Sequence, residues 1–112
     1  MTGSRPVPFS ISIDDQPARA LVAVEGELDL ATAPALEDAV MARLLDGGHV
    51  LLDLGGLEFM DSTGVRVIVS AHRAAQEHGG RFMLVRTPPD GPVGRVLRIS
   101  GLDGVLDIVD GS

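Results

Sequence analysis

The stretch EFMDSTGVRVIV, Glu58–Val69, marks a change from a polar loop to an apolar-rich helix. Asp61 is followed by two hydroxyl side chains, Ser62 and Thr63, and then by Gly64. Asp and Ser are both favoured N-cap residues, because their side-chain oxygens accept hydrogen bonds from unpaired N–H groups of the first turn. Either Asp61 or Ser62 can therefore be the cap. Only one residue can fill that position, so capping does not explain the whole cluster.

The sequence on either side predicts a buried strand before this helix and a defined helix end after it. HVLLDL (49–54) is mostly apolar, as expected of a strand covered on both faces, and GGLEFMD (55–61) predicts a loop. The helix is expected to end at Gly79–Gly80, since glycine readily takes the left-handed conformation just past a helix. One face of the helix carries Val65, Ile68, Val69, His72 and Ala75.

The N-terminal half predicts two strands and a helix. FSISI (9–13) alternates apolar and polar residues, which is typical of a half-exposed strand. ARALVAVEG (18–26) predicts a second strand, close enough in sequence to pair with the first in antiparallel fashion. A helix follows, with Thr32 as its candidate N-cap and Pro34 in its first turn. Gly47–Gly48 end that helix.

The C-terminal half adds a strand, RFMLVR (81–86), a helix, VGRVLRISG (93–101), and a short last strand, VLDIV (105–109). The resulting order predicts an α/β fold with a mostly parallel sheet of four to five strands and an antiparallel N-terminal edge strand. Crossovers between parallel strands are nearly always right-handed, so strands in chain order would put the helices mainly on one face. We expect a short irregular tail at residues 1–8 and a single domain over residues 9–112.

The composition argues for a globular cytoplasmic protein. The 112 residues are 45% hydrophobic and include no cysteine, which excludes disulfide frameworks, thiol catalysis and Cys-ligated zinc. The net charge of −7 and the lack of a Lys/Arg cluster argue against a nucleic-acid partner. No apolar run approaches the ~18 residues of a membrane span, and Met1–Ser10 lacks the apolar core of a signal peptide. We expect neither nucleic acid nor a membrane as partner.

Motifs for catalysis, metal binding and nucleotide binding are missing, so we expect no metal, no cofactor and no enzyme activity. A Ser-His-Asp triad stays an open alternative, because its members meet only in space and the chain has His49, His72 and His78. Against a hydrolase that uses Ser62, MDSTG lacks the glycine that a nucleophile elbow carries two residues before its serine.

A hydroxyl at the start of a helix is also well placed to carry a phosphate. The phosphate would meet free N–H groups and the positive end of the helix dipole. It would add roughly −1.5 to −2 charge to a patch that already holds Asp61 and Glu58. Two interpretations of the cluster therefore stand side by side: plain helix capping, and a phosphorylation switch that acts on a docking partner.

Four ordered blocks resemble the anti-sigma factor antagonists (anti-anti-sigma factors), small stand-alone STAS-domain proteins of bacterial regulation. The blocks are VEGELDLATAPAL (24–36), VLLDLGGLEFMDSTGVRVIV (50–69), HGGRFMLV (78–85) and VGRVLRISGLDGVLDI (93–108). A single Asp-Ser-Thr-Gly match would be weak evidence, whereas four blocks in the order and spacing of the family are strong evidence for the resemblance. The resemblance covers nearly the whole chain and implies the STAS fold.

In this family the serine directly after the aspartate, here Ser62, is phosphorylated by the cognate anti-sigma factor, which is itself a serine kinase. The resemblance implies that the unmodified protein binds this kinase and frees the sigma factor. Phospho-Ser62 would not bind, and a serine phosphatase would reset the switch. Asp61 is expected to hold the loop, Thr63 to be a structural hydroxyl, and Gly64 to let the partner's backbone come close. Asp29 is expected to face the same rim, where α/β sheets put their sites.

Two features depart from the family pattern. Val65 and Arg66 stand where relatives often carry Leu-Gly. Arg66 puts a cation one turn from Ser62, where it can pair with Asp61, pair with a phosphate or select a partner. The sequence reaches Ser112 soon after its last predicted strand, so we expect the terminal helix of many relatives to be absent. An unphosphorylated scaffold in a signalling or lipid-transport assembly is the alternative function.

Overall fold

Five strands form a single mixed sheet in the computed structural model, which describes residues 7–111. The strands are β1 (Ser10–Asp15), β2 (Ala20–Leu28), β3 (His49–Met60), β4 (Arg81–Val85) and β5 (Asp107–Val109). The helices are α1 (Ala33–Leu44), α2 (Ser62–His78) and α3 (Pro92–Ser100), and a short 3-10 helix, η1 (Leu102–Gly104), precedes β5. Most of the tail predicted at residues 1–8 lies outside the described residues, and so does Ser112.

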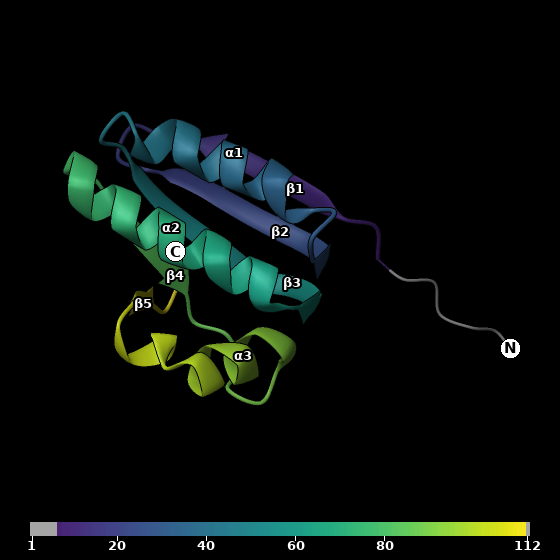
Figure 1. The fold of residues 1–112 in the computed structure, drawn as a ribbon. Helices are drawn as coiled ribbons and strands as arrows, with labels where there is room; N and C mark the ends of the chain where they lie inside the picture. The colour runs from purple at the N-terminus through teal and green to yellow at the C-terminus, as the bar shows by residue number, and fades with distance from the viewer. Residues whose placement is uncertain (1–6, 112) are drawn as a thin grey trace, which may run out of the picture.

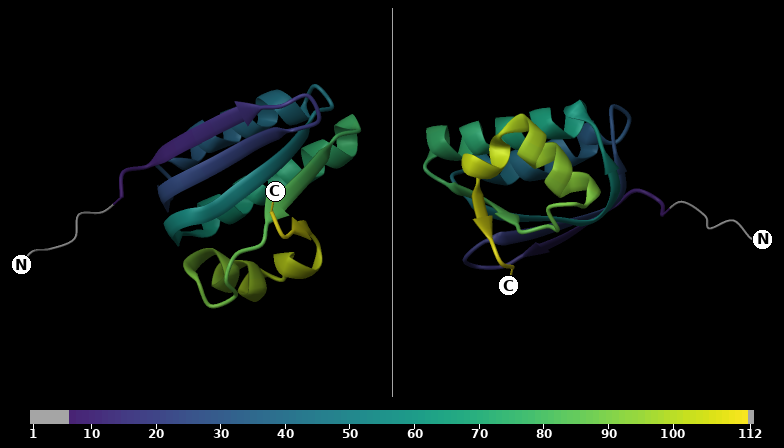
Figure 2. Two further views of the ribbon diagram at one scale, coloured as in Figure 1. Left: turned by 180° about the vertical axis from the view of Figure 1, so that it is seen from behind. Right: turned by 90° about the horizontal axis from the view of Figure 1, so that it is seen from below.

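The strands lie side by side in the order in which they occur in the chain. β1 runs antiparallel to β2, and each later strand runs parallel to its neighbour. α1 and α2 lie in front of the sheet in Figure 1, and the strands come to the front when the molecule is seen from behind in Figure 2. The predicted α/β class, with an antiparallel N-terminal edge strand and helices mainly on one face, is confirmed.

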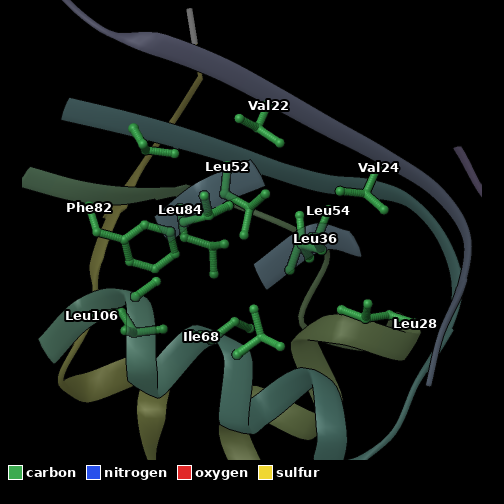
Figure 3. Packing of buried hydrophobic residues seen from close by; sticks show 14 of the residues in the cluster. Val22, Val24, Leu28, Leu36, Leu52, Leu54, Ile68, Phe82, Leu84 and Leu106 are labelled. Carbon is green, nitrogen blue, oxygen red and sulfur yellow. The ribbon is translucent and has the colours of Figure 1, made fainter. Parts of the chain in front are cut away.

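The hydrophobic core lies between the helices and this face of the sheet. Val22, Leu52 and Leu84 are register partners on adjacent strands, and all three are buried. Figure 3 shows their side chains pointing toward α2, which contributes Ile68. Leu97 of α3 and the buried residues of α1 belong to the same cluster. A single core therefore packs all three helices against the sheet.

β3 is longer than predicted, because the expected loop over residues 55–61 is mostly strand. β3 continues to Met60 through two positions where its register with β2 shifts, the first between Asp53 and Gly56. Gly55 donates its N–H to Asp53 Oδ1 (2.8 Å), and a side chain at Gly56 would come within 2.9 Å of the Val24 carbonyl oxygen. The two glycines belong to a β-bulge rather than to a loop.

The boundaries of α2 agree better with the sequence, whereas α1 ends at Leu44, three residues before the predicted stop at Gly47–Gly48. α2 ends at His78, and Gly79 follows with φ 76°, as predicted for a left-handed glycine after a helix. α1 has its proline in the first turn, but the Thr32 side chain makes no capping hydrogen bond. The last strand is two residues shorter at its start than predicted.

Among residues 7–111, no helix is both long and apolar enough to cross a bilayer.

An ion pair ties the end of β1 to α1, and it gives a pH-dependent prediction. Arg43 donates from Nε and Nη2 to the two carboxylate oxygens of Asp15, each over 2.8 Å. These hydrogen bonds lower the pKa of the Asp15 carboxyl, against a smaller opposing effect of burial. Because the folded-state pKa lies below the unfolded one, the stabilisation is present above the unfolded pKa. It is lost as the pH falls through the folded pKa.

An NMR titration of the Asp15 carboxyl will therefore give a midpoint below the ordinary range for aspartate. Arg43→Gln will move this midpoint upward, because the carboxylate then loses its cationic donor. The effect on stability will be small, since the Asp15 side chain is 63% exposed. An unchanged midpoint in Arg43→Gln would show that the ion pair does not persist in solution.

Candidate functional site

The candidate site lies on the rim where β2 and β3 end side by side. Leu28 and Met60 form the last register pair of these two strands, and the next residues are Asp29 and Asp61. The Asp61 N–H donates to the Leu28 carbonyl oxygen over 3.2 Å, which joins the two strand ends. Figure 1 shows α1 and α2 starting at this same end of the sheet. The structure thus places Asp29 on the same rim as Asp61, as expected for parallel strands.

Asp61 is the N-cap of α2, which settles the choice between Asp61 and Ser62. Its backbone is extended (φ −104°, ψ −169°), and its Oδ1 accepts a hydrogen bond from the Thr63 N–H over 2.8 Å. Ser62 is the first residue of the helix, and its side chain is exposed. Within residues 7–111 the Ser62 hydroxyl has no hydrogen-bond partner. Another protein can therefore reach it.

Gly64 lets the start of α2 lie close against the ends of β2 and β3. Thr63 is half-buried, and its N–H is already used by the cap. Gly64 is buried, and a side chain there would come within 2.5 Å of Met60 Cγ and 2.9 Å of Leu28 Cδ2. We expected Gly64 to let a partner's backbone approach. The close approach that this glycine allows is instead between α2 and the strand ends of its own chain.

Asp29 shapes the turn between β2 and α1. Its Oδ1 accepts hydrogen bonds from the N–H groups of Ala31 (3.0 Å) and Thr32 (3.2 Å). The Thr32 hydroxyl accepts from the Asp29 N–H (3.0 Å) and donates to the Glu27 carbonyl oxygen (2.8 Å). The Thr32 side chain thus stabilises this turn and does not cap α1. Asp29 also stabilises this turn, and its carboxylate is directed into its own turn.

A groove of about 260 Å³ runs between the first turns of α1 and α2. Thr63 and Arg66 line it from α2, and Glu37 and Asp38 line it from α1. Arg66 is exposed and forms no ion pair within residues 7–111. Leu30, three residues before the start of α1, also lines the groove.

Two exposed apolar residues on this rim were not predicted. Leu30 is 77% exposed and Phe59 is 46% exposed. Leu30 lies between the end of β2 and the start of α1. It therefore belongs neither to the apolar residues of the strand nor to the apolar face of the helix. That mismatch is the signal that could have identified it. Leu30 lines the groove between α1 and α2, whereas Phe59 is exposed one residue before the end of β3.

The three histidines are too far from Ser62 to serve as its base. His72 and His78 follow on the same helix, and at 1.5 Å per residue their Cα atoms lie about 15 and about 24 Å away. His49 starts β3 at the opposite end of the strand from Met60. The triad that the sequence left open is therefore excluded for Ser62. Among the described residues, no group of three or more His, Asp or Glu side chains is arranged to hold a metal ion.

The capping bond of Asp61 gives a second prediction. Asp61→Ala will lower the free energy of unfolding by about 1 kcal/mol, because the first turn of α2 loses its acceptor. Asp61→Asn keeps an acceptor oxygen and serves as the control, with a loss of less than about half as much. Urea denaturation measures both. Equal losses would mean that the carboxylate's charge matters here and the capping bond does not.

Known proteins are similar to this chain in sequence and in fold. The family model described as "Mlab, STAS domain" matches residues 11–110. The anti-sigma F factor antagonist of Paenibacillus polymyxa is 33% identical over 94 residues, which cover 80% of this chain and 77% of that protein.

Solved structures agree with these relatives. The crystal structure of an anti-sigma factor antagonist from Mycobacterium paratuberculosis matches with a TM-score of 0.79 at 29% identity, covering 94% of this chain and 88% of that one. The phosphorylated form of the Bacillus cell fate determinant SpoIIAA has the same fold, with a TM-score of 0.69 at 20% identity, covering 89% and 91%. The four sequence blocks and the five-stranded sheet thus lead to one conclusion: the chain belongs to the STAS-domain family, among the anti-sigma factor antagonists.

Proposed function

We propose that the unmodified rim binds a cognate anti-sigma factor and thereby releases a sigma factor. In this proposal the anti-sigma factor is also the serine kinase that phosphorylates Ser62. Phosphorylation ends the binding, and a serine phosphatase restores the unmodified hydroxyl. The protein itself catalyses no reaction and works in the cytoplasm, where sigma factors act.

The observation that carries the proposal is the position of Ser62. Its hydroxyl is exposed, lies at the first residue of α2 and is not used in any hydrogen bond among residues 7–111. A kinase must bring this oxygen into its own active site, which an exposed hydroxyl beside a fixed cap permits. The relatives support the proposal by their names as anti-sigma factor antagonists, and SpoIIAA exists in a phosphorylated form.

The surrounding residues have distinct roles in this proposal. Asp61 and Gly64 hold the start of α2 on the sheet, so that the Ser62 hydroxyl is presented in a fixed position. Asp29 holds the neighbouring turn, which presents Leu30 as an apolar contact for the partner. The chain's net charge of −7 and the carboxylates of Asp29 and Asp61 at this rim favour a basic partner surface.

The phosphorylation step can be tested by mass spectrometry of the intact protein after incubation with anti-sigma factor kinases of its host and ATP. We expect one phosphate on the wild-type protein, one on Thr63→Ala and none on Ser62→Ala. Thr63 is the matched control, because it is the adjacent hydroxyl and is only half-buried. A lasting absence of phosphate on the wild-type protein would favour the unphosphorylated scaffold instead.

A further inference from the structure

Arg66 is the cation nearest in sequence to Ser62 on α2, and the proposed switch gives it no role so far. We propose that Arg66 holds the phosphate of phospho-Ser62 through an ion pair across one turn of α2. The inference rests on the proposed function for its biological use, since it concerns the modified form of the same serine. It assigns to this chain an intramolecular phosphate-binding residue.

The geometry of the helix brings the two residues together. Ser62 and Arg66 are the first and fifth residues of α2. Residues four apart on a helix lie on the same face, with Cβ atoms about 5–6 Å apart. Both side chains are exposed, so each can move toward the other without disturbing the core. A guanidinium presents a planar fork of donors that matches two phosphate oxygens.

Arg66 is also free to take this role. Four other arginines of the described chain pair with aspartates, namely Arg43, Arg81, Arg86 and Arg98. Arg66 has no acidic partner within 4.0 Å among residues 7–111, although Glu37 and Asp38 line the same groove from α1. A phosphate carries roughly twice the charge of either carboxylate, and it would be attached one helical turn away.

The pairing would change the docking rim in two ways. The phosphate adds negative charge next to Asp61, the residue directly before Ser62. At the same time it draws the one cation of the groove lining toward the start of α2, away from Glu37 and Asp38. Arg66 neutralises only about one of the phosphate's roughly two charges, so a negative charge remains to be desolvated by a partner. A partner surface that fits the unmodified groove meets a different charge pattern after phosphorylation.

The test uses the isolated protein with phosphoserine incorporated at position 62 during translation, so it needs neither the kinase nor the anti-sigma factor. The second pKa of the phosphate, ordinarily about 6, is measured by phosphorus NMR at about 0.15 M salt. We expect it to be lower by about half a pH unit in the wild-type protein than in Arg66→Gln. Asp29, Glu58 and Asp61 on the rim, and Glu37 and Asp38 on α1, raise this pKa equally in both proteins.

Arg73→Gln is the matched control, because it removes the same charge from another exposed position of α2. Residue 73 lies about 16 Å from residue 62 along the helix, beyond the screening length of about 8 Å at this salt concentration. We expect a shift below about 0.1 pH unit in this control.

A second measurement reports on the contact itself. In the wild-type protein, phosphorylation should shift the Arg66 Nε–H resonance and slow its exchange with water, and the Arg73 resonance should stay in place. Equal phosphate pKa values in the wild-type protein and Arg66→Gln would overturn the proposal. So would equal shifts in Arg66→Gln and Arg73→Gln. Neither result would bear on whether a kinase modifies Ser62, which the mass-spectrometric test decides separately.

Discussion

Leu28→Ala will lower the free energy of unfolding by about 2–5 kcal/mol. Leu28 is completely buried at the end of β2, and its Cδ2 lies under Gly64 at the start of α2. Truncation removes buried methyl groups and leaves a cavity that the helix start cannot fill, because Asp61 and Gly64 fix that start on the strands. The cavity lies directly beneath the candidate site.

Leu30→Ala is the matched control, because it removes the same atoms two residues further along at a position that is 77% exposed. Its effect on stability should stay within about 0.5 kcal/mol. Urea unfolding followed by circular dichroism measures both variants. Similar losses for Leu28→Ala and Leu30→Ala would contradict the described packing of the rim.

Ser62→Glu will weaken binding to the anti-sigma factor by about 2 kcal/mol or more, which is roughly a 30-fold higher Kd. Ser62→Ala will bind about as tightly as the wild-type protein. The reason is that a partner covering Ser62 must desolvate the added carboxylate next to Asp61 and Glu58. Alanine removes only a hydroxyl that makes no hydrogen bond among the described residues.

Ser12→Glu controls for added charge alone. Ser12 is exposed on the edge strand β1, away from the rim. Its substitution should leave the Kd unchanged within about twofold, because the added charge is remote and screened by salt. Isothermal titration calorimetry compares the three variants with the wild-type protein. Equal affinities for Ser62→Glu and Ser62→Ala would count against a charge-gated interface.

The start of α2, to within one residue, and its end could be predicted from sequence because the signals are local. Asp61 as cap and Gly79 after the last turn act on groups within a few residues of themselves. The position of Asp29 beside Asp61 also followed from sequence, since parallel strands end at the same edge of a sheet. The helix ends follow from residues beside them, and the position of Asp29 follows from the predicted strand order.

The path of β3 and the exposed rim could not be predicted in the same way. Gly55 and Gly56 look like loop residues in isolation, but pairing with β2 keeps them in a bulged strand. That pairing depends on residues some thirty positions earlier. Gly64 was predicted to let a partner's backbone come close, because the sequence alone does not show that Leu28 and Met60 pack against it.

The proposed switch is tested most directly by the affinity of the anti-sigma factor for the unmodified and the phosphorylated form of this chain. Protein with serine at position 62 and protein with phosphoserine at position 62 would be titrated into the same partner under the same conditions. We expect tight binding of the unmodified form and a Kd at least about 30-fold higher for the phosphorylated form. Equal Kd values for the two forms would contradict it.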